Sequence, residues 1–402
     1  MEPHIFTDFL LFLLLLIALA AGWHLGRRST GLQLHMAGKR GQSAPDKDYF
    51  VGLNYLLNDE PDDAIDIFTD FLEINAKTLD TYIALGKLLR RRGKVDQSIT
   101  IYQELLGKGI FGESAIHEIK LNLVQSYIAA GLLDRAEFIL DELKKSTGAV
   151  KSRALEYAIS LAQQEKEWEK GIAAILDLIR IISGERRESL QLQASHFYCE
   201  LALSDMARGH AARARTNLKL ASDMDRMNPR VSMLRGELEM QYGNDREAIK
   251  YLLRVNKQDS LFLAEVFPRL VDCYRKAGKE KALRKFVEEC METNSSTSVV
   301  LGISMFLRQE RGLDAAREYL EHKLGAKSSL RLLYSLLKLD DDTLSTDHGH
   351  RGQVLELLGE YLETQPQYQC HNCGFELKTL HWLCPSCAEW GTVRHLTGIL
   401  GE

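Results

Sequence analysis

The sequence is poor in proline, with seven among 402 residues. Because proline interrupts α-helices, the long stretches without it are compatible with continuous helices. An excess of charge of one sign is also missing: the formal net charge is -5, and lysine and arginine form no long basic block. The chain therefore lacks the electrostatic footprint of a nucleic-acid-binding protein. We expect a nearly all-α body and no nucleic-acid partner.

Signs of redox or nucleophilic catalysis are missing as well. The sequence has no glycine-rich dinucleotide fingerprint and no flavin-type domain. Three of its seven cysteines, Cys199, Cys273 and Cys290, are scattered along the chain. Lone cysteines at helical positions behave as small buried hydrophobic residues rather than as ligands or nucleophiles. We expect a protein that is not an enzyme.

A long apolar run stands at the N-terminus, from Ile5 to Trp23, interrupted only by Thr7 and Asp8. At about 1.5 Å per residue, its length nearly matches the ~30 Å hydrocarbon core of a membrane. A cleaved signal peptide is the alternative. A signal peptide has lysine or arginine before its apolar run, and here neither residue precedes the run. We expect a transmembrane anchor over residues 1–27 and a juxtamembrane linker over 28–48.

The orientation of this anchor follows from the basic residues behind it, Arg27, Arg28, Lys39 and Arg40. The positive-inside rule places the N-terminus on the outer side of the membrane and the bulk of the chain in the cytoplasm. A reducing cytoplasm also suits paired cysteines that hold a metal.

Glycines recur at a nearly constant spacing. Gly209, Gly243, Gly278 and Gly312 are 34, 35 and 34 residues apart, and Gly93 precedes Gly131 by 38. A period of 34 residues is typical of tetratricopeptide repeats, in which two helices form a hairpin. We expect these glycines to adopt the positive φ of the turn. Four or five positions later a small residue allows close approach of the second helix: Ala136, Ala214, Ala248, Ala282 and Ala316.

Two early repeats keep the same period at several positions. Gly52, Tyr55, Ala64 and Phe68 are each followed 34 residues later by a counterpart: Gly86, Leu89, Ser98 and Tyr102. We expect an all-α tetratricopeptide-repeat solenoid over residues 49–365, with about nine hairpins and a degenerate last one. Such a solenoid offers a concave surface for an extended peptide or another protein. The polar segment 340–351 interrupts the register, and its histidines are expected to be solvated rather than metal-bound.

The densest basic cluster lies in the first helix of the second repeat. Lys87, Arg90 and Arg91 are spaced to share one side of that helix. They are candidates for binding acidic groups of a partner or lipid headgroups. The alternative is a solvated face, whose positive charge is favourable near a helix C-terminus.

The C-terminal segment, residues 366–402, carries a metal-binding pattern. Two CxxC pairs, Cys370 with Cys373 and Cys384 with Cys387, are separated by ten residues. Two such pairs supply the four thiolates that Zn²⁺ accepts in a closed structural site. Iron is a less favoured occupant, which would make an electron-transfer module. His371 and His381 are not needed as ligands.

Aromatic residues are unusually many in this small module: Phe375, Trp382 and Trp390. A core of some 35 residues cannot hold them all, so we expect some of them to pack on the repeats. We expect Trp168, at helical spacing, to fill the repeat core. A nucleic-acid zinc ribbon is disfavoured because the module has little positive charge.

Several phrases of the sequence make its family recognisable. These are GRR at Gly26, GLNYLL at Gly52, HFYCELAL at His196, RVSMLRG at Arg230, YQCHNCGF at Tyr368 and CPSCAEW at Cys384. With them, the chain resembles the lipopolysaccharide assembly protein B family of Gram-negative bacteria from about Gly22 onwards. The resemblance implies a rubredoxin-like C-terminal module with Cys370, Cys373, Cys384 and Cys387 as metal ligands.

The same resemblance implies a function. Family members are adaptors of the inner membrane that present the lipid A deacetylase LpxC to the protease FtsH and link lipopolysaccharide synthesis to export. Two other hypotheses stay open: a generic membrane-tethered scaffold for cell-envelope assembly, and an iron-bearing redox module. Self-association into a homo-oligomer is also left open.

Overall fold

The computed structural model describes Tyr55 and residues 78–294, 296–341 and 349–401. It divides into two units after Phe111, and the first unit contributes only α4 and α5 beyond Tyr55 to the described part. The anchor and linker predicted for residues 1–48 lie outside the described residues. Within the described ranges, no helix is both long and apolar enough to cross a membrane.

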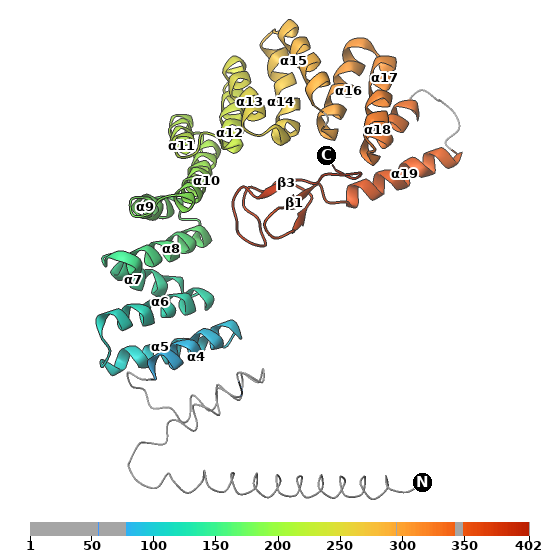
Figure 1. Cartoon of the computed structure of the whole chain (residues 1–402). Coiled ribbons are helices and arrows are strands. Elements are labelled where there is room, and N and C mark those ends of the chain that lie inside the picture. The colour runs from blue at the N-terminus through green and yellow to red at the C-terminus, as the bar shows by residue number, and fades with distance from the viewer. Residues whose placement is uncertain (1–54, 56–77, 295, 342–348, 402) are drawn as a thin grey trace, which may run out of the picture. The chain divides into compact units, whose positions relative to one another are not determined.

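The described chain is a succession of helical hairpins, each made of two consecutive helices (Figure 1). In the first unit, α4 (Leu79–Arg91) pairs with α5 (Val95–Lys108). In the second unit the hairpins are α6 (Glu113–Ala129) with α7 (Leu133–Leu143), α8 (Gly148–Glu165) with α9 (Trp168–Ile179), α10 (Glu185–Ala207) with α11 (Ala211–Met224), α12 (Pro229–Gln241) with α13 (Asp245–Gln258), α14 (Leu263–Lys276) with α15 (Glu280–Thr293), α16 (Thr297–Arg311) with α17 (Leu313–Ala326), and α18 (Leu330–Asp341) with α19 (Gly349–Thr364). A short 3-10 helix, η1 (Ser260–Phe262), precedes α14. The predicted all-α repeat solenoid is confirmed.

The turns inside the hairpins use glycine as the spacing predicted. All six glycines of the register have positive φ, between 65° and 93°. The spacing missed the α8–α9 hairpin because Lys166, with φ 58°, takes the left-handed position there. The left-handed conformation has a higher conformational free energy for lysine than for glycine. A lysine therefore does not mark a turn in the sequence as a glycine does.

Small residues sit where the two helices of a hairpin cross. A Cβ on Gly86 would lie 2.4 Å from the ring of Tyr102, and the hydroxyl of Ser98 donates to the Gly86 carbonyl at 2.8 Å. Ala136, Ala214, Ala248 and Ala316 are fully buried at the equivalent positions. The prediction for Ala282 is wrong: it is exposed, and Leu283 is buried in its place. The buried position therefore lies five residues after Gly278, as it does after Gly131, Gly209 and Gly243.

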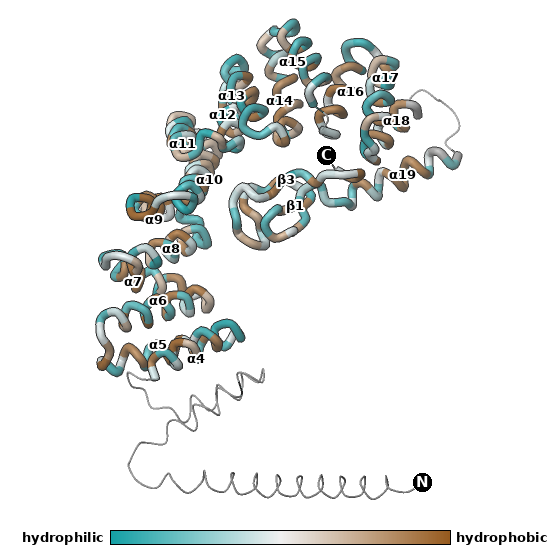
Figure 2. Tube along the Cα trace, viewed as in Figure 1, coloured by the Kyte–Doolittle hydropathy of each residue, from teal (hydrophilic) through white to brown (hydrophobic). Residues whose placement is uncertain are grey.

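From α12 to α18, the apolar faces of successive hairpins merge into one core (Figure 2). Cys273 and Cys290 are buried within this core, and Cys199 is buried in α10, which confirms the prediction that all three are small buried hydrophobic residues. Burial raises the pKa of Cys199 to about 12 and that of Cys273 and Cys290 to about 11. These thiols are therefore protonated and inert at neutral pH.

A small antiparallel sheet follows α19 and holds the C-terminal module together. Its strands are β1 (Tyr368–Cys370), β2 (Glu376–Leu377) and β3 (Val393–His395), in the order β2-β1-β3. Tyr368, Leu377 and Val393 form its core beside the buried Cys370 and Cys384. So small a core needs an additional staple, and the cysteines supply the atoms for one.

Candidate metal centre and its dock on the repeats

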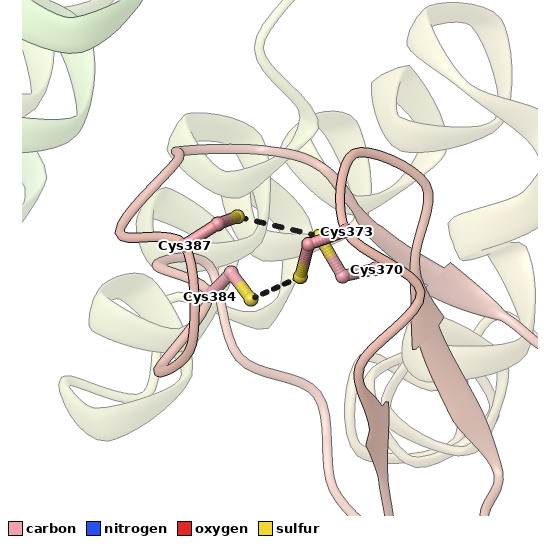
Figure 3. Close-up of side chains that lie close together, drawn as sticks. All are labelled: Cys370, Cys373, Cys384 and Cys387. Atoms are coloured by element: carbon pink, nitrogen blue, oxygen red, sulfur yellow. Dashed lines mark hydrogen bonds between the residues drawn. The ribbon is translucent and has the colours of Figure 1, made fainter. Parts of the chain in front are cut away.

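The structure brings the four predicted cysteines together. Their sulfur atoms all lie within 4.8 Å of one another (Figure 3). The Sγ of Cys370 is 3.7 Å from that of Cys387, and the Sγ of Cys373 is 3.7 Å from that of Cys384. Each CxxC pair is therefore split across the cluster, and two turns of the chain contribute two sulfurs each.

These distances fit a tetrahedral metal ion. With metal–sulfur bonds of ~2.3 Å, the edges of an S₄ tetrahedron are about 3.8 Å long. The two observed 3.7 Å distances match that edge, while a disulfide would need sulfurs about 2 Å apart. All four cysteines are free thiols in the structure. Zinc and iron both form such bonds, so the geometry fits either metal.

The surroundings of Cys370 favour its thiolate, the form that binds metal. Burial acts to raise the pKa of Cys370, but the Thr392 hydroxyl and the backbone amides of Asn372 and Cys373 donate to its sulfur and lower the pKa. The Thr392 hydroxyl lies 3.2 Å from the sulfur. Hydrogen bonds of this kind orient a thiolate and support its charge.

The histidines of the module do not join the cluster. His371 and His381 are exposed, and the Nδ1 of His381 lies 3.0 Å from the carbonyl of Thr379. Of the loop predicted to be solvated, residues 342–348 lie outside the described part, and His350 is exposed. Among the described residues, only the four cysteines form a metal-ligand group.

We call the C-terminal module, residues 366–401, the ribbon. Its second CxxC turn is followed at once by Trp390, which anchors the ribbon on the repeats. Trp390 is buried, with 6% of its surface exposed, and its indole N–H donates to the side chain of Gln163 in α8 at 2.8 Å. Its ring stacks on His196 of α10 at 4.9 Å and 17°, and meets Phe197 edge-on at 6.0 Å. The amide of Gln163 also donates to the carbonyl of Ala388 at 3.2 Å. An aromatic side chain with a satisfied N–H is a strong packing anchor.

Arg230 of α12 lies between the two tryptophans of the ribbon. Its guanidinium is 5.8 Å from the ring centre of Trp382 and 5.6 Å from that of Trp390. The side chain is buried, and it donates to Glu200 of α10 at 2.6 Å. A buried guanidinium held by a carboxylate and two aromatic faces joins α10, α12 and the ribbon.

The buried His196 completes this cluster as a neutral ring. Burial and the positive charges of Arg230 and Arg394 hold its pKa well below the usual value. The Arg230 guanidinium lies 3.4 Å from the Nδ1 of His196, which fits a ring nitrogen that accepts. A neutral imidazole stacks on Trp390 without the cost of burying a second positive charge beside Arg230.

Trp382 makes the second aromatic contact with the repeats. Its ring stacks on Phe262 of η1 at 4.9 Å and 25°. The guanidinium of Arg394, in β3, lies 5.0 Å from the centre of the same Phe262 ring. The repeat core therefore continues into the ribbon through η1.

Charged and polar contacts border this apolar interface at the start of α14. Arg394 pairs with Asp259 at 3.5 Å, and His395 approaches Glu265 at 3.1 Å. The hydroxyl of Tyr368 donates to the same carboxylate. Burial acts to raise the pKa of Glu265, but these hydrogen bonds dominate and lower it.

The last residues of the chain extend the dock along the repeats. The carbonyl of Ile399 accepts from the backbone N–H of Leu330, at the start of α18, at 2.9 Å. The carbonyl of Gly401 accepts from the hydroxyl of Thr297, at the start of α16, at 2.9 Å. The bond from Leu330 satisfies a backbone donor at a helix N-terminus, where such donors lack partners within the helix. The C-terminal segment thus contacts the first helix of six hairpins, from α8 to α18.

The basic cluster predicted for partner binding lies in the first unit, in the last two turns of α4. Lys87 and Arg90 are half-buried, and Arg91 is exposed. The ribbon belongs to the second unit. Their role in binding stays a prediction.

The expectation that some ribbon aromatics pack on the repeats is confirmed by Trp382 and Trp390, whereas Phe375 is 44% exposed. Trp168 is only half-buried: it contacts Phe197 at 5.0 Å and also Trp390 at 6.2 Å. Sequence reasoning missed Gln163, His196 and Arg230 as parts of the dock. Charged and polar residues at solenoid positions normally face solvent, so their spacing gave no sign of this use.

Comparison with known proteins agrees with both parts of the chain. The rubredoxin metal binding domain matches residues 368–395, and the tetratricopeptide repeat matches residues 199–260. A solved tetratricopeptide repeat protein from Parabacteroides merdae is 13% identical, with a TM-score of 0.33, over 71% of this chain and all of that one.

Two curated relatives match over nearly the whole length. Lipopolysaccharide assembly protein B of Escherichia coli K12 is 33% identical over 98% of this chain and 99% of its own. The protein of the same name from Haemophilus influenzae Rd is 28% identical over 96% of this chain and 97% of its own. The chain therefore belongs to the lipopolysaccharide assembly protein B family.

Proposed function

We propose that this protein is a non-enzymatic adaptor in lipopolysaccharide assembly, anchored in the inner membrane with its repeats and metal ribbon in the cytoplasm. Its task is to present the lipid A deacetylase LpxC to the protease FtsH and so to couple the rate of synthesis to export. Membership of the family supports the assembly role, because the relatives match over their full length. The membrane anchor is proposed for residues 1–27 and the linker for 28–48.

The observation that carries the adaptor proposal is the dock of the ribbon on the repeats. Trp382 and Trp390 fix the ribbon against η1 and α10, and the C-terminal carbonyls fix it to α16 and α18. A solenoid alone is a curved surface that flexes between its repeats. A ribbon held at six hairpins makes this part rigid, and a rigid surface binds a folded protein at a smaller entropic cost.

We propose further that Cys370, Cys373, Cys384 and Cys387 hold one structural zinc ion. Four thiolates complete its coordination, so no position is left for a substrate. The ion fixes both CxxC turns, and the second turn leads within three residues to Trp390. The metal thereby determines where Trp390 meets α10, although it takes no part in a reaction.

Anchoring explains how such an adaptor works on a soluble enzyme. A binding protein fixed in the membrane raises the local concentration of its cargo beside a membrane-bound protease. No new chemistry is required of the adaptor.

Affinity isolation of the full-length chain from solubilised membranes tests this proposal. The adaptor proposal predicts recovery of both the deacetylase and the protease, with less deacetylase recovered by a variant that has lost the ribbon dock. The alternative, a generic envelope scaffold, predicts recovery of neither protein. The matched control is Phe375→Ala, which changes an exposed ribbon aromatic and should recover both proteins as the native chain does.

A further inference from the structure

The four clustered cysteines bring together more negative charge than one metal ion neutralises. Four thiolates around a divalent ion leave about two negative charges in excess. Water can stabilise this charge only at sulfurs that it reaches, and the side chains of Cys370 and Cys384 are both buried. At these two sulfurs the protein itself has to provide hydrogen-bond donors.

Cys370 has a side-chain donor beside it in addition to backbone donors. The hydroxyl oxygen of Thr392 lies 3.2 Å from its sulfur, and the backbone amides of Asn372 and Cys373 donate to the same atom. The two amides belong to the first CxxC turn and are present whatever side chains that turn carries. The hydroxyl comes from the segment that follows the second CxxC turn, and it depends on which residue stands at position 392.

The Thr392 hydroxyl has two acceptors within reach but only one hydrogen to donate. The second acceptor is the carbonyl of Glu389, at 3.4 Å, and that carbonyl already accepts from the N–H of Cys384 at 3.0 Å. A thiolate is a stronger acceptor than a neutral carbonyl that has a partner. When Cys370 binds a metal as a thiolate, its sulfur is therefore both the nearer and the better acceptor for this hydroxyl.

The backbone at Thr392 is held independently of its hydroxyl. Its carbonyl accepts from the N–H of His371 at 2.9 Å, next to the pairing of β1 with β3. Valine has nearly the shape of threonine and is equally suited to extended backbone. Loss of the hydroxyl should therefore leave the sheet in place, so the hydrogen bond can be tested separately from the fold.

We propose that Thr392 is a positioning residue of the metal centre: its hydroxyl donates to the Cys370 sulfur, orients it and stabilises part of the excess negative charge. Thr392 thereby strengthens metal binding without being a ligand. Because it stands two positions after Trp390, the same hydrogen bond joins the first CxxC turn to the segment that anchors the ribbon on the repeats. This inference rests on the proposed metal-binding role of the four cysteines and not on the adaptor role.

The test is the zinc affinity of the full-length chain in detergent, measured by competition with a chromophoric chelator. Thr392→Val removes the donor, and Thr392→Ser keeps the hydroxyl without the methyl group. Thr397→Val is the control, because it removes a hydroxyl from an exposed position of the same ribbon. Loss of such a hydrogen bond typically lowers metal affinity about 10–100-fold. We expect a loss of about tenfold in Thr392→Val, most of the affinity restored in Thr392→Ser, and native affinity in the control.

Loading the same proteins with Co²⁺ gives a readout of the hydrogen bond itself, the sulfur-to-metal charge-transfer absorption. A donor lowers the energy of the sulfur electrons, so this absorption should move to longer wavelength in Thr392→Val and stay in place in Thr392→Ser and the control.

Three results would overturn the inference: native zinc affinity in Thr392→Val, a lower affinity without the spectral shift, or a lower affinity that Thr392→Ser does not restore. A native chain that binds neither zinc nor cobalt would overturn the metal centre itself and this inference with it. The failure of the metal centre is thus seen in the native chain, and the failure of the role of Thr392 is seen in the variants.

Discussion

Replacing Trp390 with alanine should weaken the docking of the ribbon on the repeats without unfolding the ribbon itself. The indole lies between α8 and α10, where it stacks on His196, donates to Gln163 and faces the guanidinium of Arg230. It does not belong to the small ribbon core of Tyr368, Leu377 and Val393. The substitution therefore removes the anchor and leaves the four cysteines in place.

The size of the effect follows from this burial. Truncation of a buried tryptophan to alanine costs about 3–5 kcal/mol, which includes the lost contacts and the cavity left behind. At 1.4 kcal/mol for each factor of ten, the undocked population should rise by roughly two to three and a half orders of magnitude. Trp382, Arg394 and the C-terminal carbonyls still hold the ribbon, so the docked state can remain the majority.

Hydrogen exchange of residues 366–401, with metal analysis of the same sample, measures this change. We expect exchange in this segment to accelerate by a factor of about 100 or more, because it exchanges through local opening. Metal content should stay as in the native chain. Phe375→Ala is the control, since it removes an exposed aromatic from the same ribbon and should leave exchange at the interface unchanged. Native-like exchange in Trp390→Ala, or loss of its metal, would refute the reasoning.

Three further predictions concern the hairpins, their charges and the anchor. Gly236→Ala should lower the melting temperature, because its Cβ would lie 2.5 Å from Leu252 and overpacking typically costs about 1–3 kcal/mol. The control Gly325→Ala, at a helix position with open space around it, should raise the melting temperature slightly. Equal shifts in the two variants would contradict the close packing at Gly236. Hydrogen bonds from Arg215 lower the pKa of Glu239, so this pair should stabilise the fold above the ordinary glutamate pKa and lose that contribution as the pH falls through the lowered value; urea unfolding at several pH values should show a weaker acid dependence in Arg215→Ala, and an identical dependence would contradict the assignment. Deleting residues 1–23 should leave a helical, folded protein with much weaker activity in cells, since the repeats bury their own core; loss of helical circular dichroism would show that this segment belongs to the fold, and full complementation would show that tethering is dispensable.

The repeat architecture was predictable because its signals are local. Glycine is strongly favoured at a left-handed turn whatever the neighbouring repeats do, so the spacing of Gly93, Gly131 and Gly278 alone predicted their hairpins. The glycine spacing did not reveal the α8–α9 hairpin, because Lys166 adopts the left-handed conformation at its turn. The free-energy cost of that conformation is offset by the packing of the rest of the fold. The prediction for Ala282 was wrong because the buried position after Gly278 comes one residue later, at Leu283. The spacing of small residues does not reveal this shift of one residue.

The four cysteines were predictable for a similar reason, since two CxxC turns specify a metal site by themselves. The dock was only partly predictable. An excess of aromatics announced an interface, but its partners Gln163, His196 and Arg230 lie about 160 to 230 residues away from Trp390 in the sequence. Pairings over such separations are set by the curvature of the stacked hairpins, which no local pattern records.

A degradation chase of the lipid A deacetylase tests the central claim, that a metal-fixed ribbon on the repeats makes this protein an adaptor for proteolysis. Cells should carry either the native chain or Cys384→Ser, at equal abundance, as their only copy. Losing one of four thiolates removes the ~10–16 kcal/mol that structural zinc typically supplies, far more than so small a ribbon gains by packing. We predict a longer half-life of the deacetylase in the variant, while the repeats remain helical. An unchanged half-life, with the metal shown to be lost, would contradict the account.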